Sequence, residues 1–271
     1  MENITIETIE NMFYTDFVGF INQWNVLPGA FNTLSKWKVF SNLNENSRIL
    51  EIACTTGFSS RELAIMTNCS GKAFDISEKS IKSAIENKKK YASKIKMDYL
   101  VEDGYKFKSE EKFTHILIGA SLKFFPKPEE MLKVCLEHLK DGGFILTSPF
   151  YIKSPIPESL ISEFKKVFGI TPTTESYKDI MKMYRGLEVI YEERNDLIEE
   201  TNEELEHYCQ STIDRVCKEK GINDKELYSA MYKRLIEIKR MSNKLRPYQR
   251  YSVLVLRYRK NIYPSRYVEL F

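Results

Sequence analysis

Residues 48–57 read Arg-Ile-Leu-Glu-Ile-Ala-Cys-Thr-Thr-Gly, and a second apolar stretch a little further on ends at Asp75. Apolar periodicity predicts a buried strand over residues 49–52, a helix over residues 58–66 and a second strand that leads to Asp75. The small residues of the intervening loop let the backbone approach a ligand, and the following helix presents free N–H groups to it.

The position of Asp75 indicates a ribose site. An acid at the tip of the second strand can accept hydrogen bonds from both hydroxyls of a ribose, and in nucleotide-binding folds it lies about 20 residues after the loop. Asp75 follows Gly57 by 75 − 57 = 18 positions. The alternative interpretation of the whole unit is an ordinary strand, loop and helix without a ligand.

The loop lacks the dinucleotide fingerprint G-x-G-x-x-G, because it contains one glycine, Gly57. The sequence from Leu50 to Gly57 instead resembles the first motif of class I S-adenosylmethionine-dependent methyltransferases, an acid followed by small residues at alternate positions that end in glycine. Ala53 and Thr55 replace two of the family glycines. The branched Cβ of Thr55 limits how closely the backbone can come to a ligand.

This resemblance implies S-adenosyl-L-methionine as the cofactor. Glu51 would help to hold the methionine ammonium through the loop or a water, and Asp75 would bind the ribose. Ile76 would cover the adenine face and Asp103 would accept from the adenine amino group, although Asp103-Gly104 also reads as a plain turn. The predicted cofactor-binding residues are Glu51, Ala53, Cys54, Thr55, Gly57, Asp75, Ile76, Asp103, Gly104 and Ala120.

Strand and helix patterns alternate from residue 48 to about residue 150. Strands are predicted near 98–104, 113–120 and 144–147, and Lys140-Asp141-Gly142-Gly143 is expected to end the helix that precedes the last of them. Later strands are predicted at 187–192 and 251–258. The sequence therefore predicts an α/β, Rossmann-like doubly wound, mostly parallel seven-stranded sheet, to which the resemblance adds an antiparallel last strand.

The N-terminus, a helical insertion and the C-terminal tail lie outside this alternation. Residues 1–40 are predicted to form an N-terminal helical lid, and residues 41–260 a methyltransferase domain with a helical insertion at about 196–247. A capping box at Thr201 opens the insertion's first helix and Gly221 stops it. Residues 261–271 are a C-terminal tail.

The acceptor side has weaker candidates. Phe13, Phe17, Phe20 and Trp24 fall at helical spacing, which favours a helix packed on the core. By resemblance the same helix would be a lid that closes over the cofactor with Phe13 or Tyr14. The catalytic residue stays unknown, because a sulfonium carries its own activation. The candidate substrate-binding residues are Phe13, Tyr14, Lys123, Phe150 and Tyr151.

Composition narrows the remaining possibilities. No apolar run reaches the length of a membrane span, and the acidic N-terminus lacks the pattern of a signal peptide. The five cysteines form no C-x-x-C pair and are expected to be free thiols in a reducing cytosol, so a cytoplasmic location is predicted. The three scattered histidines lack metal-ligand spacing, so no metal site is expected. The sequence does not predict an oligomeric state.

Charge is distributed unevenly along the last third of the chain. Residues 187–206 contain nine acids against Arg194, and residues 239–266 contain nine bases and no acid. Either the two segments attract each other, or the basic segment binds an anionic partner. The favoured function is methyl transfer to a small molecule. The alternatives are an RNA or peptide methyltransferase that uses the basic segment, and a non-catalytic protein that binds an adenosyl ligand or a partner.

Overall fold

The computed structural model describes residues 4–263. Their strands form one sheet in the order β3-β2-β1-β4-β5-β8-β6, and β7 pairs with β8 outside this path. Strands β1 to β5 are parallel, and β8 runs antiparallel to β5, β6 and β7. The predicted Rossmann-like sheet is confirmed, with a short additional strand, β6. The strands are β1 (Arg48–Ile52), β2 (Ser70–Asp75), β3 (Lys96–Val101), β4 (Phe113–Gly119), β5 (Leu139–Thr147), β6 (Phe150–Ile152), β7 (Glu188–Asp196) and β8 (Gln249–Arg257).

Helices cover both faces of this sheet because successive strand residues point in opposite directions. Val253 and Val255 pack into the core beneath α3, α4 and α5, whereas Leu254 and Leu256 pack into the core beneath α6 and α8. These helices are α3 (Ala30–Phe40), α4 (Phe58–Thr67), α5 (Glu78–Tyr91), α6 (Pro128–His138) and α8 (Tyr177–Met183).

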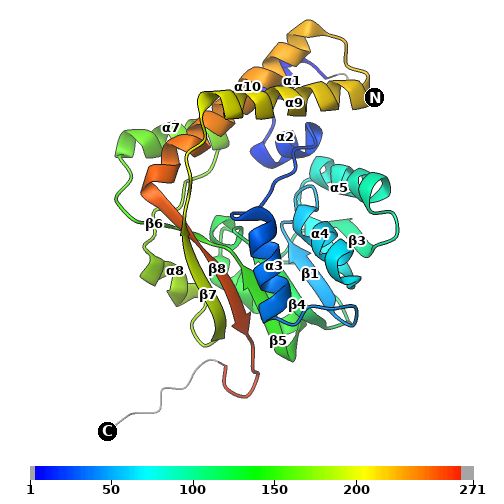
Figure 1. Ribbon diagram of the computed structural model, residues 1–271, viewed down its shortest axis with the longest axis vertical. Coiled ribbons are helices and arrows are strands. Elements are labelled where there is room, and N and C mark those ends of the chain that lie inside the picture. The colour runs from blue at the N-terminus through cyan, green and yellow to red at the C-terminus, as the bar shows by residue number, and fades with distance from the viewer. Residues whose placement is uncertain (1–3, 264–271) are drawn as a thin grey trace.

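The remaining helices share a separate core and stand above the sheet in Figure 1. We call them the helical module: α1 (Ile6–Asn11), α2 (Tyr14–Phe20), α7 (Glu158–Phe168), α9 (Asn202–Lys220) and α10 (Lys225–Leu245). Helix α9 begins with the predicted capping box at Thr201 and ends at Gly221. The module therefore joins the N-terminus of the chain to the helices inserted before β8.

Helix α2 connects the helical module to the rest of the fold, which we call the sheet unit (the sheet and the helices on its two faces), by crossing α5 closely. A Cβ on Gly19 would lie 2.3 Å from the amide nitrogen of Ser80, so the two backbones touch at this glycine. Ser80 and Ser83 donate hydrogen bonds to the carbonyl oxygens of Thr15 and Gly19, at 2.8 and 2.7 Å. Polar side chains therefore fill the buried face of α5 at this crossing.

Two local predictions were wrong. The aromatic spacing suggested a helix through Trp24, but α2 ends at Phe20 and Asn22 adopts a left-handed conformation with φ of 47°. Residues 140–143 were expected to end a helix, but α6 already ends at His138 and those residues begin β5. In both cases the backbone leaves the helical conformation before the sequence pattern indicates the end of the helix.

The acidic and basic segments of the last third pair with each other. Strand β7 lies beside β8, and α9 packs against α10, so their opposite charges meet along both pairs of elements. This arrangement supports the mutual-attraction interpretation. The ion pairs are Glu188–Arg259 (3.2 Å), Asp196–Arg250 (3.2 Å), Glu200–Arg246 (2.9 Å) and Glu206–Arg240 (2.8 Å).

Other sequence predictions concern chain organisation. The boundaries at residues 40, 196, 247 and 260 stay predictions, and most of the predicted tail, including Arg266, lies outside the described residues. Helix α3, which the predicted lid included, packs against α4 and β8. All five cysteines are free. Within residues 4–263, each helix is too short or too polar to cross a bilayer.

Candidate functional site

The loop between β1 and α4 has three residues in the left-handed conformation at alternate positions. The φ angles are 49° at Ala53, 46° at Thr55 and 73° at Gly57. Only glycine adopts this region without steric cost, and a β-branched residue there is an outlier. The loop therefore keeps the backbone path of an alternating glycine motif, although two of the three residues carry a Cβ.

Gly57 is required both by its φ angle and by its neighbours. A Cβ on Gly57 would lie 2.5 Å from Cε1 of Tyr99, whose ring is buried below the loop. The Tyr99 hydroxyl lies 3.3 Å from the Gly57 carbonyl oxygen, to which it donates a hydrogen bond. The third strand thus supports the loop from beneath.

Asp75 connects the tip of β2 to this loop. Its carboxylate accepts one hydrogen bond from the backbone N–H of Thr55 and another from that of Ser77, each at 2.9 Å. Burial raises the pKa of Asp75, and these two N–H groups oppose that rise. Ser77 also donates to the carboxylate of Asp16 on α2, at 2.5 Å, so a second acid lies near the site.

Glu51 ties the end of β1 to the first turn of α4. Its carboxylate accepts from the backbone N–H of Ser60 at 3.1 Å, in a region where the side chain is 7% exposed. Burial raises the pKa of Glu51 to about 7, against the opposing effect of hydrogen bonds from Ser60 and Ser59. Glu51 thus orients the helix whose N-terminus faces the loop.

The other predicted cofactor residues follow the neighbouring strands. Ile76 comes directly after Asp75 and is 72% exposed, an unusual position for an isoleucine. Asp103 lies in the turn after β3, where its carboxylate accepts from the N–H of Tyr105 at 3.1 Å. Gly104 is buried against Met131, and Ala120 lies half-buried just after β4. The parallel strands bring all these positions to one edge of the sheet.

Cys54 is the one thiol of the loop. Its side chain is 3% exposed, and burial, together with Glu51 and Asp75, raises the pKa of Cys54 well above its ordinary value. A thiol in such surroundings stays protonated and is a poor nucleophile. Cys54 therefore serves the packing of the loop.

The predicted lid residues lie in the helical module. Phe13 is 82% exposed between α1 and α2, whereas Tyr14 packs against Phe168 with ring centroids 4.9 Å apart. Both line a cavity of about 480 Å³ that Phe168 and Arg234 also border. Burial raises the pKa of Tyr14 to about 12, so its hydroxyl stays neutral.

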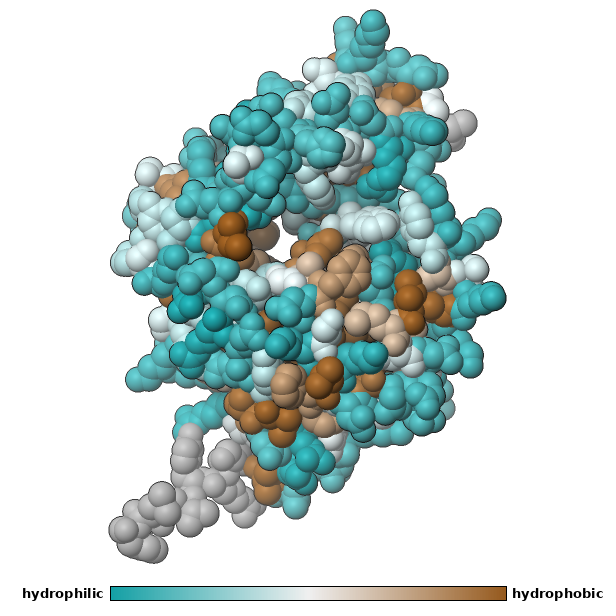
Figure 2. All heavy atoms as spheres, in the orientation of Figure 1, coloured by the Kyte–Doolittle hydropathy of each residue, from teal (hydrophilic) through white to brown (hydrophobic). Residues whose placement is uncertain are grey.

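The other three acceptor candidates have different surroundings in the structure. Lys123 forms an ion pair with Glu175. Phe150 and Tyr151 are neighbours on β6 but pack on opposite faces of the sheet, Phe150 with the core beneath α3 and Tyr151 with the core beneath α8. Figure 2 shows the surface hollowed between the helical module and the sheet, with apolar side chains around the opening.

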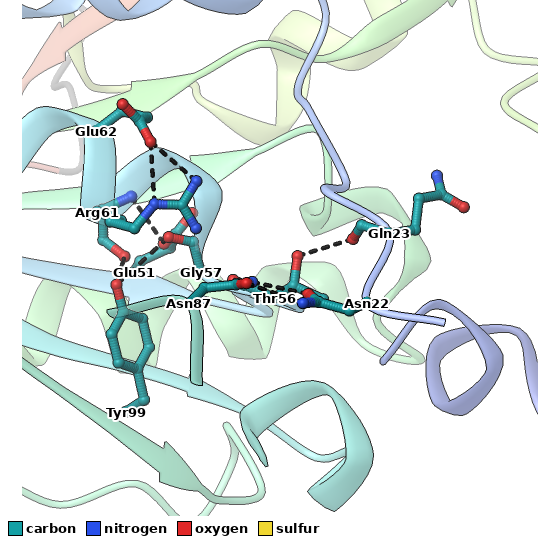
Figure 3. A network of polar contacts seen from close by, with 10 residues as sticks. Asn22, Gln23, Glu51, Thr56, Gly57, Arg61, Glu62, Asn87 and Tyr99 are labelled. Carbon is teal, nitrogen blue, oxygen red and sulfur yellow. Dashed lines mark hydrogen bonds and ion pairs between the residues drawn. The ribbon is translucent and has the colours of Figure 1, made fainter. Parts of the chain in front are cut away.

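Sequence reasoning missed the residues that hold the loop from outside. Asn22 and Asn87 form a buried amide pair beside Thr56, and the Thr56 hydroxyl donates to the carbonyl of Gln23 at 2.8 Å (Figure 3). Arg61 is also buried there, and its guanidinium carbon lies over the ring of Trp24, 4.8 Å from the ring centroid. The polar spacing Ser80, Ser83, Asn87 on α5 was an available signal, because it interrupts an otherwise amphipathic helix.

Sequence comparison matches residues 49–143 to a family described as a methyltransferase domain. Over 103 residues the chain is 34% identical to malonyl-[acyl-carrier protein] O-methyltransferase 2 of Ilyobacter polytropus. That alignment covers 38% of this chain and 39% of the curated relative, so the match spans about two fifths of either protein.

Comparison of structures extends the likeness to most of the chain. The crystal structure of the MccD protein has a TM-score of 0.70 and 26% identity, covering 86% of this chain and 99% of that chain. A SAM-dependent methyltransferase from Thiobacillus denitrificans, in complex with S-adenosyl-L-homocysteine, has a TM-score of 0.62 and 16% identity, covering 89% and 96%. At 16% identity the second likeness is one of fold.

Proposed function

We propose that the protein is a class I, S-adenosylmethionine-dependent methyltransferase, since residues 49–143 match a methyltransferase domain, and that it transfers the methyl group of its cofactor to a small-molecule acceptor. The observation that carries the proposal is the loop at residues 53–57. Its left-handed residues and its hydrogen bond to Asp75 join the two elements that an adenosyl ligand needs.

Three features of the described residues support a fit to S-adenosyl-L-methionine. The Asp75 carboxylate is 4% exposed and keeps lone pairs beyond its two backbone bonds, and the exposed Ile76 offers an apolar surface next to it. The N-cap residue Gly57 places no side chain over the first turn of α4, where Glu51 takes the Ser60 N–H and leaves those of Phe58 and Ser59 for a carboxylate. We propose Glu51, the loop backbone, Asp75, Ile76 and Asp103 as the binding groups.

When bound, the sulfonium supplies an already activated methyl group for in-line displacement. The contribution of the chain is to place the two reactants and to exclude water. Around the loop, Cys54 is held protonated, and Lys123 is engaged with Glu175, so neither is offered as a base. We therefore propose catalysis by placement, with an acceptor that brings its own nucleophile.

Charge pairing favours a small acceptor over a nucleic acid. Binding to a phosphate backbone depends on free Lys and Arg side chains. In the described part of the basic segment, Arg240, Arg246, Arg250 and Arg259 each pair with a carboxylate of the acidic segment. The alternative in which this segment binds RNA has correspondingly little support.

Calorimetry with S-adenosyl-L-methionine and S-adenosyl-L-homocysteine tests the cofactor part. We expect both to bind, and Asp75→Asn to weaken binding about 10–100-fold, because hydrogen bonds to a charged group contribute about 1.5–3 kcal/mol. Asp98→Asn on the exposed side of β3 is the matched control and should change nothing. Failure of the unmodified protein to bind either compound would remove the enzyme proposal.

The acceptor class needs its own experiment. The protein is incubated with methyl-labelled cofactor and a cell extract separated into low-molecular-weight, RNA and protein fractions. We expect label in the low-molecular-weight fraction. Label in the RNA or protein fraction would contradict the small-molecule proposal, and cofactor binding without any transfer would favour the non-catalytic alternative.

A further inference from the structure

A chain of buried hydrogen bonds runs from the helical module to residues 53–57, which we call the ligand loop. Asn22 donates through Nδ2 to Oδ1 of Asn87 at 2.9 Å, and Asn87 donates through Nδ2 to Oδ1 of Asn22 at 2.8 Å (Figure 3). The second hydrogen on Nδ2 of Asn87 reaches the carbonyl oxygen of Thr56 at 3.3 Å. We call Asn22, Asn87 and Thr56 the amide latch. Their exposed fractions are 5%, 1% and 0%.

The latch continues into the helical module at its other end. Arg215 on α9 donates from Nη2 to the carbonyl oxygen of Asn22 at 2.8 Å. Asn22 is the left-handed residue that follows α2, a conformation that asparagine tolerates well. Three segments far apart in the sequence, at residues 22, 87 and 215, therefore hold one position of the loop at Thr56.

Burial makes the latch sensitive to displacement. Both amide groups lie away from water, and a buried donor or acceptor that loses its partner is costly. If α2 and α9 shifted by more than a hydrogen bond tolerates, the amides of Asn22 and Asn87 would lose their partners. Conversely, a shift of Thr56 would release Asn87. The latch is satisfied only when the helical module and the loop occupy compatible positions.

We infer that the amide latch positions the ligand loop and couples cofactor binding to the placement of the helical module. Asn87 is a positioning residue, because it touches the carbonyl of Thr56 and not the ligand itself. This inference rests on the proposed function for the identity of the ligand. It assigns a role in cofactor binding to α9, which lies outside the matched domain at residues 49–143.

Helix α5 supplies a matched control. Ser83 is as buried as Asn87 and donates to the carbonyl of Gly19 at 2.7 Å, which also joins α5 to α2. The Ser83 hydroxyl bonds to α2 and not to the loop, so Ser83→Ala removes an interface bond and leaves the latch in place. Any effect of Asn87→Ala on the ligand beyond that of Ser83→Ala belongs to the latch.

The first measurement is the affinity for S-adenosyl-L-homocysteine, together with stability in urea. We expect Asn87→Ala to weaken binding about tenfold, which corresponds to about 1.4 kcal/mol. Ser83→Ala should change the affinity less than twofold, although it should lose about as much stability in urea as Asn87→Ala does. Equal affinities in the two variants would overturn the inference. If Asn87→Ala does not fold, Arg215→Met replaces it, because it removes the hydrogen bond to the Asn22 carbonyl and leaves both latch amides in place.

Amide hydrogen exchange gives a readout that needs no ligand. In the free protein, exchange at residues 53–57 should be faster in Asn87→Ala than in Ser83→Ala, and equal rates would refute the latch. Adding the ligand should slow exchange in α9 of the unmodified protein but not of Asn87→Ala. If the unmodified protein binds no ligand, the proposed function fails, while the ligand-free comparison still decides whether the latch holds the loop.

Discussion

Replacing the two strained loop residues by glycine should stabilise the protein. Ala53 and Thr55 have φ of 49° and 46°, where a residue with a Cβ pays about 1–2 kcal/mol. Glycine removes that strain but adds about 0.5–1 kcal/mol of lost conformational freedom on folding. We therefore expect Ala53→Gly and Thr55→Gly each to raise the free energy of unfolding by about 0.5–1 kcal/mol.

The control is an alanine with ordinary backbone geometry. Ala230 lies within α10 and is half-buried, as Ala53 is, so Ala230→Gly should lower the free energy of unfolding by about 1 kcal/mol. The same chemical change should thus have opposite signs at the two positions. The sign, rather than its size, separates loop strain from general glycine effects.

Urea unfolding monitored by tryptophan fluorescence measures these changes. Trp24 packs near the loop through Phe58, and Trp37 is fully buried, so both report on the sheet unit. In thermal unfolding, a gain of that size corresponds to about 1–4 °C for a chain of this length. If both loop variants lost stability as Ala230→Gly does, the argument that the loop is held in a strained conformation would be wrong.

Two further predictions concern the same loop. Gly57→Ala should lower the free energy of unfolding by about 2–4 kcal/mol, because it adds a left-handed alanine and a Cβ 2.5 Å from Tyr99. Gly169 has φ of 71° and open space around it, so Gly169→Ala should lower it by about 1 kcal/mol. Similar losses of stability in urea for the two variants would contradict the clash. Burial raises the pKa of Glu51 to about 7 in the folded state. The stability that this shift contributes is fully present below the pKa of Glu51 in the unfolded chain, and it is lost as pH rises through 7. Glu51→Gln should therefore gain stability relative to the unmodified protein, by about 3 kcal/mol between pH 4.5 and pH 8, and a difference independent of pH in urea unfolding would refute the shift.

Local sequence patterns predicted most of the sheet. Apart from the end of α6, the strands and helices of residues 48–147 follow apolar periodicity and end signals, because each element buries one clear stripe against the sheet. The capping box at Thr201 and the stop at Gly221 worked for the same reason, since both act within a few residues. The short β6 was missed, because three residues carry too little pattern.

Long-range polar contacts could not be predicted from the sequence. Asn22 and Asn87 are 65 positions apart, and each alone reads as an ordinary polar residue. The exposed Phe13 and the half-buried Tyr14 were similarly indistinguishable, because the spacing of aromatic residues does not tell which side chain packs on the other helices of the module. Roles for these residues depend on how α2 crosses α5, and a glycine with a close backbone neighbour, Gly19, fixes that crossing.

The strained loop is the strongest reason to assign a ligand to this edge of the sheet. A connection between a strand and a helix has many unstrained solutions, and strain persists only where surrounding structure over-determines the backbone. Here Asp75, Tyr99 and Asn87 each bond a different peptide of the loop, at Thr55, Gly57 and Thr56. Three independent contacts that hold an unfavourable path are hard to explain by folding alone, because unstrained loops would satisfy the fold. They are explained if the path itself is what the ligand requires.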